Sequence, residues 1–435
     1  MPDVPTLPRI PGVPDPLNRI RLPDDLANVT TRNPEEDPAA GGLADETVEK
    51  LWDAGVSLYR SAVHPALQLC VRRNGHVVLD RSIGHARGNG PHDGKDTPKV
   101  LATPDTPFCV YSTSKGITAL VVHMLIERGA FKLDDKIADH IPGYEQHGKG
   151  GTTIAHVLAH RAGVPNLPKE LLDLQHVGDR ELIVRLLSEQ KPSHEPGTLL
   201  AYHAVTGGFI LGEIVERVTG KSIRDVLGDE ILRPLNFRWG NYGVAPEDVE
   251  QVGPAYVTGA PLLPPLSTLV ARALSRPIGE AVELSNDPRF LTAVIPAASV
   301  ITTANELSRF FEIFRCGGEL DGHRVMSPQT LRLALQEQSR LEIDFTLLFP
   351  TRFSYGLMLG AKVLSPFGLD TDLAFGHLGL INIMGYADPE RGVSVGLITS
   401  GKPIVYPEIA RFYGVMQTIG SQVPKLPESE RPVAA

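Results

Sequence analysis

The chain has 435 residues, of which 42% are hydrophobic and 21% charged, and its formal net charge is −9. These values are typical of a soluble globular protein that is large enough to bury an extensive core. The mild negative charge supplies no electropositive surface for nucleic acid, and the longest apolar stretch, near 117–126, is too short to span a bilayer. The three cysteines are too few and too scattered for a disulfide framework or a zinc site. We therefore expect a cytoplasmic protein without a nucleic-acid partner, a membrane span or a bound metal.

The N-terminal part of the sequence predicts an arm, a helix and a β-hairpin. Residues 1–44 are rich in proline and lack the basic and apolar segments of a secretory signal, so we expect an extended arm. Apolar residues then recur at helical spacing from about 45 to 60. Two strand-like runs, ALQLCVRR and HVVLDRSIG, are joined by Asn74-Gly75, a pair that strongly favours a hairpin turn. After a polar stretch, a helix is expected to begin near Ser112 and to end at about Arg128.

The rest of the chain predicts helices first and strands afterwards. Strand patterns return in FSYGLML, LAFGHL, INIMGYAD and VSVGLITS. We therefore predict an α/β fold of the α+β type, in which 45–134 and 346–420 form an antiparallel sheet flanked by helices, and 135–345 form a mainly helical domain. The tail, 421–435, is expected to be disordered. The expected helices of the middle region are Thr153–His160, Arg180–Glu189, Thr206–Thr219, Ser222–Ile231, Ala304–Cys316 and Pro328–Gln338.

Three short patterns suggest other chemistry, but their surroundings do not support it. Ser394 stands in a G-x-S-x-G pattern, yet it lies inside a predicted strand rather than on the strand–helix turn of a nucleophile elbow. Residues 143–150 nearly match a phosphate-binding loop, but Gly150 occupies the position of the required Ser or Thr. His156 and His160 have the spacing of two metal ligands on one helix face, without the glutamate or the third ligand of a zinc site. We interpret both histidines as structural or helix-capping residues.

The residues Ser112 and Lys115 open a helix whose continuation, GITALVVHMLIERG, is almost wholly apolar. Side chains three residues apart lie on one side of a helix, so the lysine amine can reach the serine hydroxyl. A serine is a weak nucleophile until a base removes its proton, and a buried lysine can be that base because burial lowers its pKa. The alternative is a serine that caps the helix beside an exposed lysine. The buried character of the helix favours the catalytic interpretation.

Two further elements come later in the chain. Tyr202 directly precedes a predicted helix, where its hydroxyl can lie in a cleft; a half-buried residue in a loop is the alternative. The segment Gly376-His377-Leu378-Gly379 ends one predicted strand, where the glycines permit close approach of a ligand. An ordinary β-turn is the alternative for this segment.

The order Ser-x-x-Lys, then Tyr, then a basic residue-x-Gly resembles the three active-site motifs of serine β-lactamases and penicillin-binding proteins. The nearest branch is that of the class C-like enzymes and the family VIII carboxylesterases. The stretches HVLAHRAGVPN, PGTLLAYHAVTGGFILGEIVERVTG and CGGELDGHRVMSP support the resemblance, which extends over about 45–415. It implies the serine β-lactamase/D,D-peptidase-like fold and a serine hydrolase that needs no cofactor.

Carried over by position, the resemblance gives each motif residue a role. Ser112 attacks the substrate carbonyl and forms an acyl-enzyme, while Lys115 and Tyr202 share general-base and general-acid duty. The backbone N–H groups of Ser112 and Leu380 form the oxyanion hole. His377 and Gly379 correspond to the Lys-Thr-Gly motif that binds substrate.

The sequence departs from the β-lactamase pattern at two places. The second motif is Tyr202-His203-Ala204, so the amide side chain that would bind a β-lactam is missing. His377 replaces the lysine of the third motif and is mostly neutral near pH 7. Both departures favour a carboxylesterase that acts on a small-molecule ester with a short- to medium-chain acyl group, although Leu380 and Ile381 are expected to narrow the cleft. The alternatives are a β-lactamase, D,D-peptidase or amidase, an acyltransferase at the same site, and a non-catalytic scaffold with this fold.

The proline-bracketed insert 259–279 is a candidate wall of the substrate site. We hypothesise that its leucines line an acyl pocket; packing against the helical region is the alternative. The sequence is compatible with a homo-oligomer and does not fix the oligomeric state. The leucines concerned are Leu262, Leu263, Leu266 and Leu269.

Overall fold

A ten-stranded sheet joins the two ends of the chain in the computed structural model, which describes residues 15–404 and 409–431. All strand pairs in it are antiparallel, and the order is β1-β3-β2-β15-β14-β13-β12-β11-β10 with β4 beside β3. The early hairpin meets the late strands where β2 pairs with β15, with Val71 opposite Val395. The antiparallel sheet predicted from the sequence is thus confirmed. The strands are β1 (Thr30–Arg32), β2 (Ala66–Arg73), β3 (His76–Arg87), β4 (Val100–Leu101), β10 (Ser339–Ile343), β11 (Pro350–Phe353), β12 (Met358–Leu359), β13 (Phe375–Gly379), β14 (Ile383–Asp388) and β15 (Val393–Thr399).

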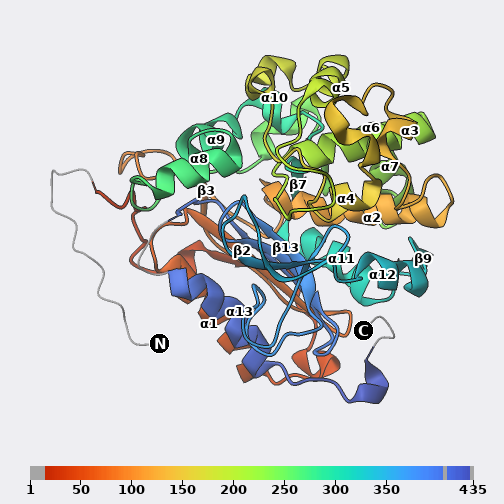
Figure 1. Cartoon of the computed structure of the whole chain (residues 1–435). Helices are drawn as coiled ribbons and strands as arrows, with labels where there is room; N and C mark the ends of the chain where they lie inside the picture. Colours follow the sequence, from red (N-terminus) through yellow and green to blue (C-terminus); the bar gives the residue numbers. More distant parts are fainter. Residues whose placement is uncertain (1–14, 405–408, 432–435) are drawn as a thin grey trace.

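Helices cover both faces of the sheet, so every residue of β2 and β15 is buried. Helices α1 (Asp45–Tyr59) and α13 (Ile409–Gln422) pack side by side below the sheet, and α11 (Ala304–Arg315) lies on the opposite face (Figure 1). The glycines of β14 and β15 allow α11 to approach closely, because a Cβ at Gly396 would lie 2.1 Å from the Ala304 carbonyl oxygen. The sequence boundary at 345/346 placed α11 in the helical domain. The apolar face of α11, which includes Phe311, instead packs on the sheet. A local sequence pattern shows that a helix has an apolar face, but it does not show whether that face packs on the sheet or on other helices.

The helical region lies on the α11 side of the sheet, with the buried helix α2 (Ser114–Glu127) between the two (Figure 1). Helices α5 (Arg180–Glu189) and α6 (Thr206–Thr219) have the bounds predicted from the sequence. No helix in the described ranges is both long and apolar enough to cross a bilayer. The remaining elements are α3 (Ile137–His140), α4 (Ile154–Leu158), α7 (Ile223–Leu227), α8 (Leu266–Leu274), α9 (Ile278–Leu284), α10 (Pro288–Leu291), α12 (Pro328–Ala334), β5 (Phe108–Cys109), β6 (Asn241–Tyr242), β7 (Val300–Thr302), β8 (Glu319–Leu320) and β9 (His323–Arg324).

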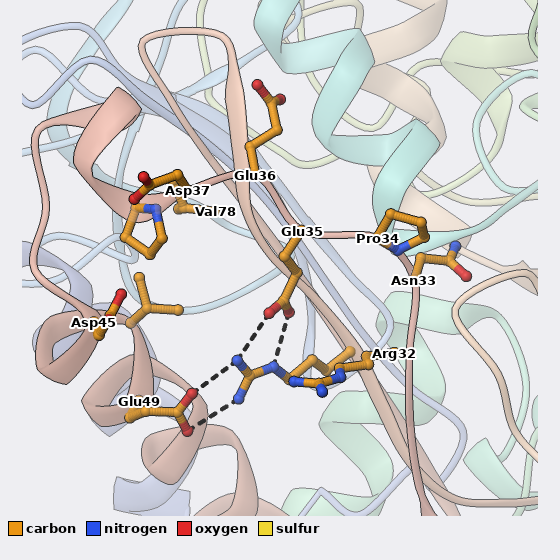
Figure 2. A pocket seen from close by; sticks show the side chains of 12 residues that line it. Arg32, Asn33, Pro34, Glu35, Glu36, Asp37, Asp45, Glu49 and Val78 are labelled. Atoms are coloured by element: carbon orange, nitrogen blue, oxygen red, sulfur yellow. Dashed lines mark hydrogen bonds and ion pairs between the residues drawn. The ribbon is translucent and has the colours of Figure 1, made fainter.

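The N-terminal segment is part of the fold from Asp15 onward, which differs from the extended arm expected over 1–44. Ile20 is buried, and strand β1 extends the sheet beside β3. The Arg81 guanidinium then donates to Glu35 at 2.8 Å and to Glu49 at 2.8 Å. Figure 2 shows the carboxylates of Glu35 and Glu49 meeting at this group. Proline content indicated an extended backbone but could not show that its side chains have partners on β3 and α1. Residues 1–14 lie outside the described part.

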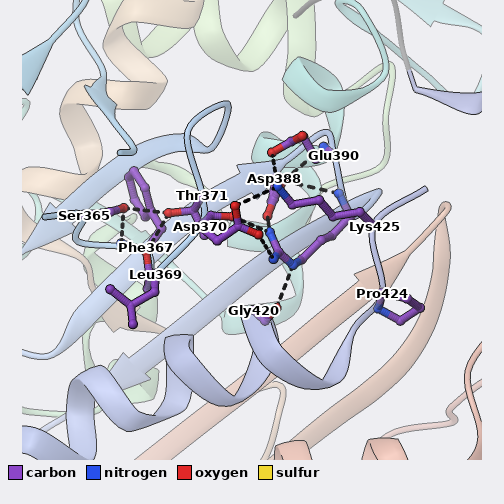
Figure 3. Close-up of polar contacts among 12 residues, drawn as sticks. Ser365, Phe367, Leu369, Asp370, Thr371, Asp388, Glu390, Gly420, Pro424 and Lys425 are labelled. Atoms are coloured by element: carbon purple, nitrogen blue, oxygen red, sulfur yellow. Dashed lines mark hydrogen bonds and ion pairs between the residues drawn. The ribbon is translucent and has the colours of Figure 1, made fainter. Parts of the chain in front are cut away.

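The C-terminal tail is also docked, so the disorder predicted for 421–435 is wrong for 421–431. Val423 and Leu426 are buried against the sheet domain. The Lys425 ammonium contacts Asp370 at 3.0 Å and Glu390 at 2.9 Å in the polar cluster of Figure 3. The composition of the tail is polar and proline-rich, but its few apolar and basic side chains all meet complementary groups. Residues 432–435 lie outside the described part.

Candidate active site

The candidate nucleophile Ser112 lies on the short 3-10 turn Tyr111–Thr113 that leads into α2. Tyr111 adopts a left-handed backbone conformation with φ of 46°, which is costly for a bulky residue. Its ring is held by a 2.7 Å hydrogen bond between its hydroxyl and Ser285 Oγ, and the Lys402 ammonium lies 5.2 Å from the ring centroid. The turn that presents Ser112 is therefore fixed by contacts from two distant segments.

Lys115 is buried one turn after Ser112, and its Nζ has three polar neighbours. It lies 3.1 Å from Ser112 Oγ, 2.8 Å from the Ala204 carbonyl oxygen and 3.1 Å from the Ala297 carbonyl oxygen. Burial lowers the pKa of this amine well below its ordinary value of 10.5, and no described carboxylate forms an ion pair with it. A neutral amine has two N–H groups and one lone pair. If the amine is uncharged, hydrogen bonds to the two carbonyls use both of its N–H groups and leave its lone pair for the Ser112 hydroxyl.

Tyr202 completes the group brought together by the structure. Lys115 Nζ lies 4.8 Å from the Tyr202 ring centroid. Burial raises the pKa of Tyr202, and a hydrogen bond to Ser112 opposes this rise, so the phenol stays protonated at neutral pH. The backbone of Tyr202 is held by Asp344, whose Oδ1 accepts its N–H at 3.1 Å. Ser112, Lys115 and Tyr202 thus lie close together at the site.

Three buried histidines, His160, His203 and His377, lie near these residues. The His160 ring lies 4.6 Å from that of Tyr202, and its Nδ1 accepts the backbone N–H of His203 at 3.2 Å. His203 faces inward, since its Nε2 accepts the Val164 N–H at 3.4 Å. We predicted His203 as a substrate-binding residue; in the structure its ring is fully buried and stacks on that of His160 at 5.7 Å. Burial lowers the pKa of His203 to about 3 and that of His160 well below its ordinary value.

His377 lies on β13, where its Nδ1 donates to the Leu378 carbonyl at 2.8 Å. Burial is the main cause that lowers the pKa of His377 to about 3, and the charge of Lys115 acts in the same direction. The ring lies 6.2 Å from that of Tyr202 and is neutral. The position of the third motif therefore offers no positive charge to a substrate.

Gly379 ends β13 directly against the turn that carries Ser112. A Cβ at this residue would lie 2.5 Å from the Val110 carbonyl oxygen, so no other residue fits without displacing the strand. Leu380 follows and lines the same cavity as Ser112. The next residue, Ile381, is left-handed with φ of 44°, which turns the chain sharply into β14. This turn sets the direction of the Leu380 backbone.

A cavity of about 150 Å³ opens beside Ser112 and is lined mostly by aliphatic side chains. We call it the leucine cavity. None of the four leucines proposed from the insert is among the residues that line it: Leu262 is half-buried, and Leu263, Leu266 and Leu269 are exposed on or before α8. The insert contributes Leu274 and Arg276 instead. Other residues that line the leucine cavity are Leu171, Leu174, Ala204, Phe209, Leu284 and Phe290.

The other patterns found in the sequence have structural roles. Ser394 lies in the interior of β15, paired with Arg72 of β2. Lys149 of the phosphate-loop pattern is buried, and its amine donates to three backbone carbonyls. His156 caps α4, since its Nδ1 accepts the Thr153 N–H at 3.3 Å. The interpretation of His156 as a capping residue agrees with this geometry.

The fold and this geometry agree with the comparisons to known proteins. Residues 44–414 match the family model described as Beta-lactamase. The chain belongs to the beta-lactamase family. It is 29% identical over 401 residues to the esterase/beta-lactamase LipL of Mycobacterium tuberculosis, covering 87% of each chain.

Solved structures of beta-lactamase-family proteins show the same fold. A penicillin-binding-protein homologue from Caulobacter crescentus aligns with a TM-score of 0.73 at 24% identity, over 87% of this chain and 98% of that one. A family VIII carboxylesterase aligns with a TM-score of 0.71 at 24% identity, over 86% of this chain and 98% of that one. The resemblance stated from the motifs is confirmed, and the chain is a serine hydrolase of the beta-lactamase family.

Three groups at the site were missed by the sequence analysis. The Ala297 carbonyl and the Asp344 carboxylate come from segments without a motif, so no signal pointed to them. His160 was noticed only for its spacing to His156, and its contact with Tyr202 depends on the fold.

Proposed function

We propose that this chain is a carboxylesterase whose nucleophile is Ser112. The observation that carries the proposal is the set of three contacts at the Lys115 amine, two to carbonyls and one to Ser112. An uncharged amine held in this way accepts the hydroxyl proton without first losing one of its own. Burial alone lowers the pKa of this amine well below its ordinary value, which favours the uncharged form that a general base needs.

The proposed reaction has two halves. The Ser112 proton moves to Lys115 Nζ while Oγ bonds to the ester carbonyl carbon, and the oxyanion is stabilised by the N–H groups of Ser112 and Leu380. When the bond to the alcohol breaks, the Tyr202 hydroxyl gives its proton to the departing oxygen and regains one from Lys115. Water then loses a proton to the same pair and attacks the acyl-enzyme; as the acyl–Oγ bond breaks, the pair returns this proton to Ser112 Oγ, and the carboxylic acid leaves.

An ester suits this site better than a β-lactam. β-Lactam recognition depends on a cation for the substrate carboxylate and on an amide partner, whereas His377 is neutral and Ala204 has no polar side chain. An amide or a β-lactam also has a poorer leaving group than an ester. We therefore propose ester hydrolysis as the main activity and rank β-lactamase, D,D-peptidase, amidase and acyltransferase activity below it.

The test is hydrolysis of p-nitrophenyl butyrate by the wild type, by Ser112→Ala and by the control Ser394→Ala. We expect Ser112→Ala to lose at least roughly 10³-fold in kcat, with near-UV circular dichroism like that of the wild type. Ser394→Ala removes a serine of the G-x-S-x-G pattern and should keep its activity. Equal activity in wild type and Ser112→Ala would refute the proposal, and faster turnover of nitrocefin than of the ester would favour a β-lactamase.

A further inference from the structure

The leucine cavity contains one feature that ester hydrolysis as such does not require. Among the described residues that line it, Arg276 is the one that carries a charge. The others are aliphatic or aromatic, apart from Ser112 and Ser285. A cavity built only for a hydrocarbon chain has no use for a guanidinium.

Arg276 is held in place by the segment across the cavity. It lies in the short connection between α8 and α9, and its Nη2 donates to the Leu172 carbonyl. The preceding residue, Ser275, accepts the backbone N–H of Leu167 through its Oγ at 3.3 Å. Two hydrogen bonds therefore tie this connection to the leucine-rich segment 167–174, so the position of the guanidinium is fixed rather than free in solvent.

The charge of Arg276 has no counter-ion in the described part of the chain. Neither Glu280 nor Asp173, the two acidic residues that act on it through space, forms an ion pair with it. One carbonyl acceptor leaves most of its five N–H donors for another partner. A partly buried guanidinium without a carboxylate is costly, and an anionic ligand removes this cost.

We propose that the leucine cavity accepts acyl groups that end in a carboxylate, so that the preferred substrates are monoesters of dicarboxylic acids. The proposal rests on the esterase function proposed above and specifies its substrate class. The ester carbonyl lies at Ser112, the methylene chain contacts the leucines, and the terminal carboxylate pairs with the Arg276 guanidinium. A cavity of about 150 Å³ is of the size that holds benzene, which corresponds to a chain of about six carbons.

The test compares two esters of equal shape, mono-p-nitrophenyl adipate and p-nitrophenyl 6-methylheptanoate, in which an isopropyl group replaces the carboxylate. We expect the wild type to favour the adipate ester by roughly ten- to a hundredfold in kcat/KM, the range of a charge-assisted pair. The ratio should fall to about one or below in Arg276→Met and be partly kept in Arg276→Lys. Arg272→Met, an exposed change on α8, is the matched control and should keep the wild-type ratio.

Each outcome separates this proposal from the esterase function. Hydrolysis of both esters with a wild-type ratio at or below one would overturn the proposal and leave the esterase function intact. A ratio that is unchanged in a folded Arg276→Met variant would also overturn it. If neither ester is hydrolysed, the esterase function itself fails, and the proposal fails with it.

Discussion

The buried amine of Lys402 provides a quantitative test of the electrostatics beside the active site. Burial lowers the pKa of Lys402 from 10.5 to about 7. The unfolded chain therefore binds one more proton than the folded chain between these two pH values, and the stability of the protein rises with pH across that window. At pH 7 and below, the buried charge costs about 4–5 kcal/mol at ~1.36 kcal/mol per pH unit.

Lys402→Met keeps most of the length of the side chain, without its terminal amine, and removes the charge. It also leaves the Thr399 carbonyl without its donor, which costs about 1–2 kcal/mol. We therefore expect the variant to be more stable than the wild type at pH 7, by about 3 kcal/mol in the free energy of unfolding. Between pH 7 and pH 10 this difference should change by about 4 kcal/mol and reverse, so that the variant is about 1 kcal/mol less stable at pH 10, because only the wild type gains stability as the amine loses its proton.

The assay is guanidinium denaturation of both proteins at a series of pH values from 6 to 10. The difference between the two curves removes the contributions of all other titrating groups. Lys149→Met is the contrasting variant, since the Lys149 amine donates to three carbonyls and its removal should destabilise the protein at pH 7. Parallel curves for wild type and Lys402→Met would contradict the lowered pKa, because they would mean that Lys402 in the folded protein has an ordinary pKa.

Three further predictions concern the active site. Tyr202→Phe should lower kcat for p-nitrophenyl butyrate by roughly 10²–10⁴ with little change in KM, since it removes only the proton donor; an unchanged kcat would exclude the hydroxyl from the reaction. Gly379→Ala should lower the free energy of unfolding by about 1–3 kcal/mol and kcat by at least roughly tenfold, because the added Cβ would lie 2.5 Å from the Val110 carbonyl oxygen. Kinetics like those of the wild type would show that the strand can shift without disturbing the site. Asp344→Ala should destabilise the fold by about 3 kcal/mol in chemical denaturation, since three backbone N–H groups lose their acceptor, while Asp344→Asn should retain most of the stability.

The elements that the sequence predicted well are those with local signals at both ends. Helix α5 begins after Asp179, which caps it by accepting the Leu182 N–H at 3.0 Å. Helix α6 ends at Gly220, which adopts the left-handed conformation of a C-cap. The hairpin turn at Asn74-Gly75 has both residues left-handed, as that pair favours. In each case the residues that fix the end of the helix or the turn lie within a few positions of it, so a local sequence pattern can predict it.

The groups that the sequence could not predict depend on contacts between distant segments. Lys115 was predicted to be buried, but its two carbonyl partners, at Ala204 and Ala297, carry no side-chain signature. The insert 259–279 was predicted as a candidate wall of the substrate site; its residues that line the leucine cavity are Leu274 and Arg276, and not the leucines proposed for it. Amphipathic spacing shows that a helix has an apolar face, but it does not show what that face packs against. In α8, part of the apolar face stays exposed to solvent.

The pairing of β2 with β15 has a consequence for how the protein is made. Val71 and Val395 are neighbours in the sheet, so the ribosome adds roughly 320 residues between them. At ~5–20 residues per second, the hairpin of β2 and β3 waits on the order of 15–65 s with an open edge before its partner strand emerges. During that interval α2 and the helices after it have time to assemble, whereas the sheet that supports Gly379 closes only when synthesis is nearly complete. The turn that carries Ser112 therefore acquires its final neighbours last.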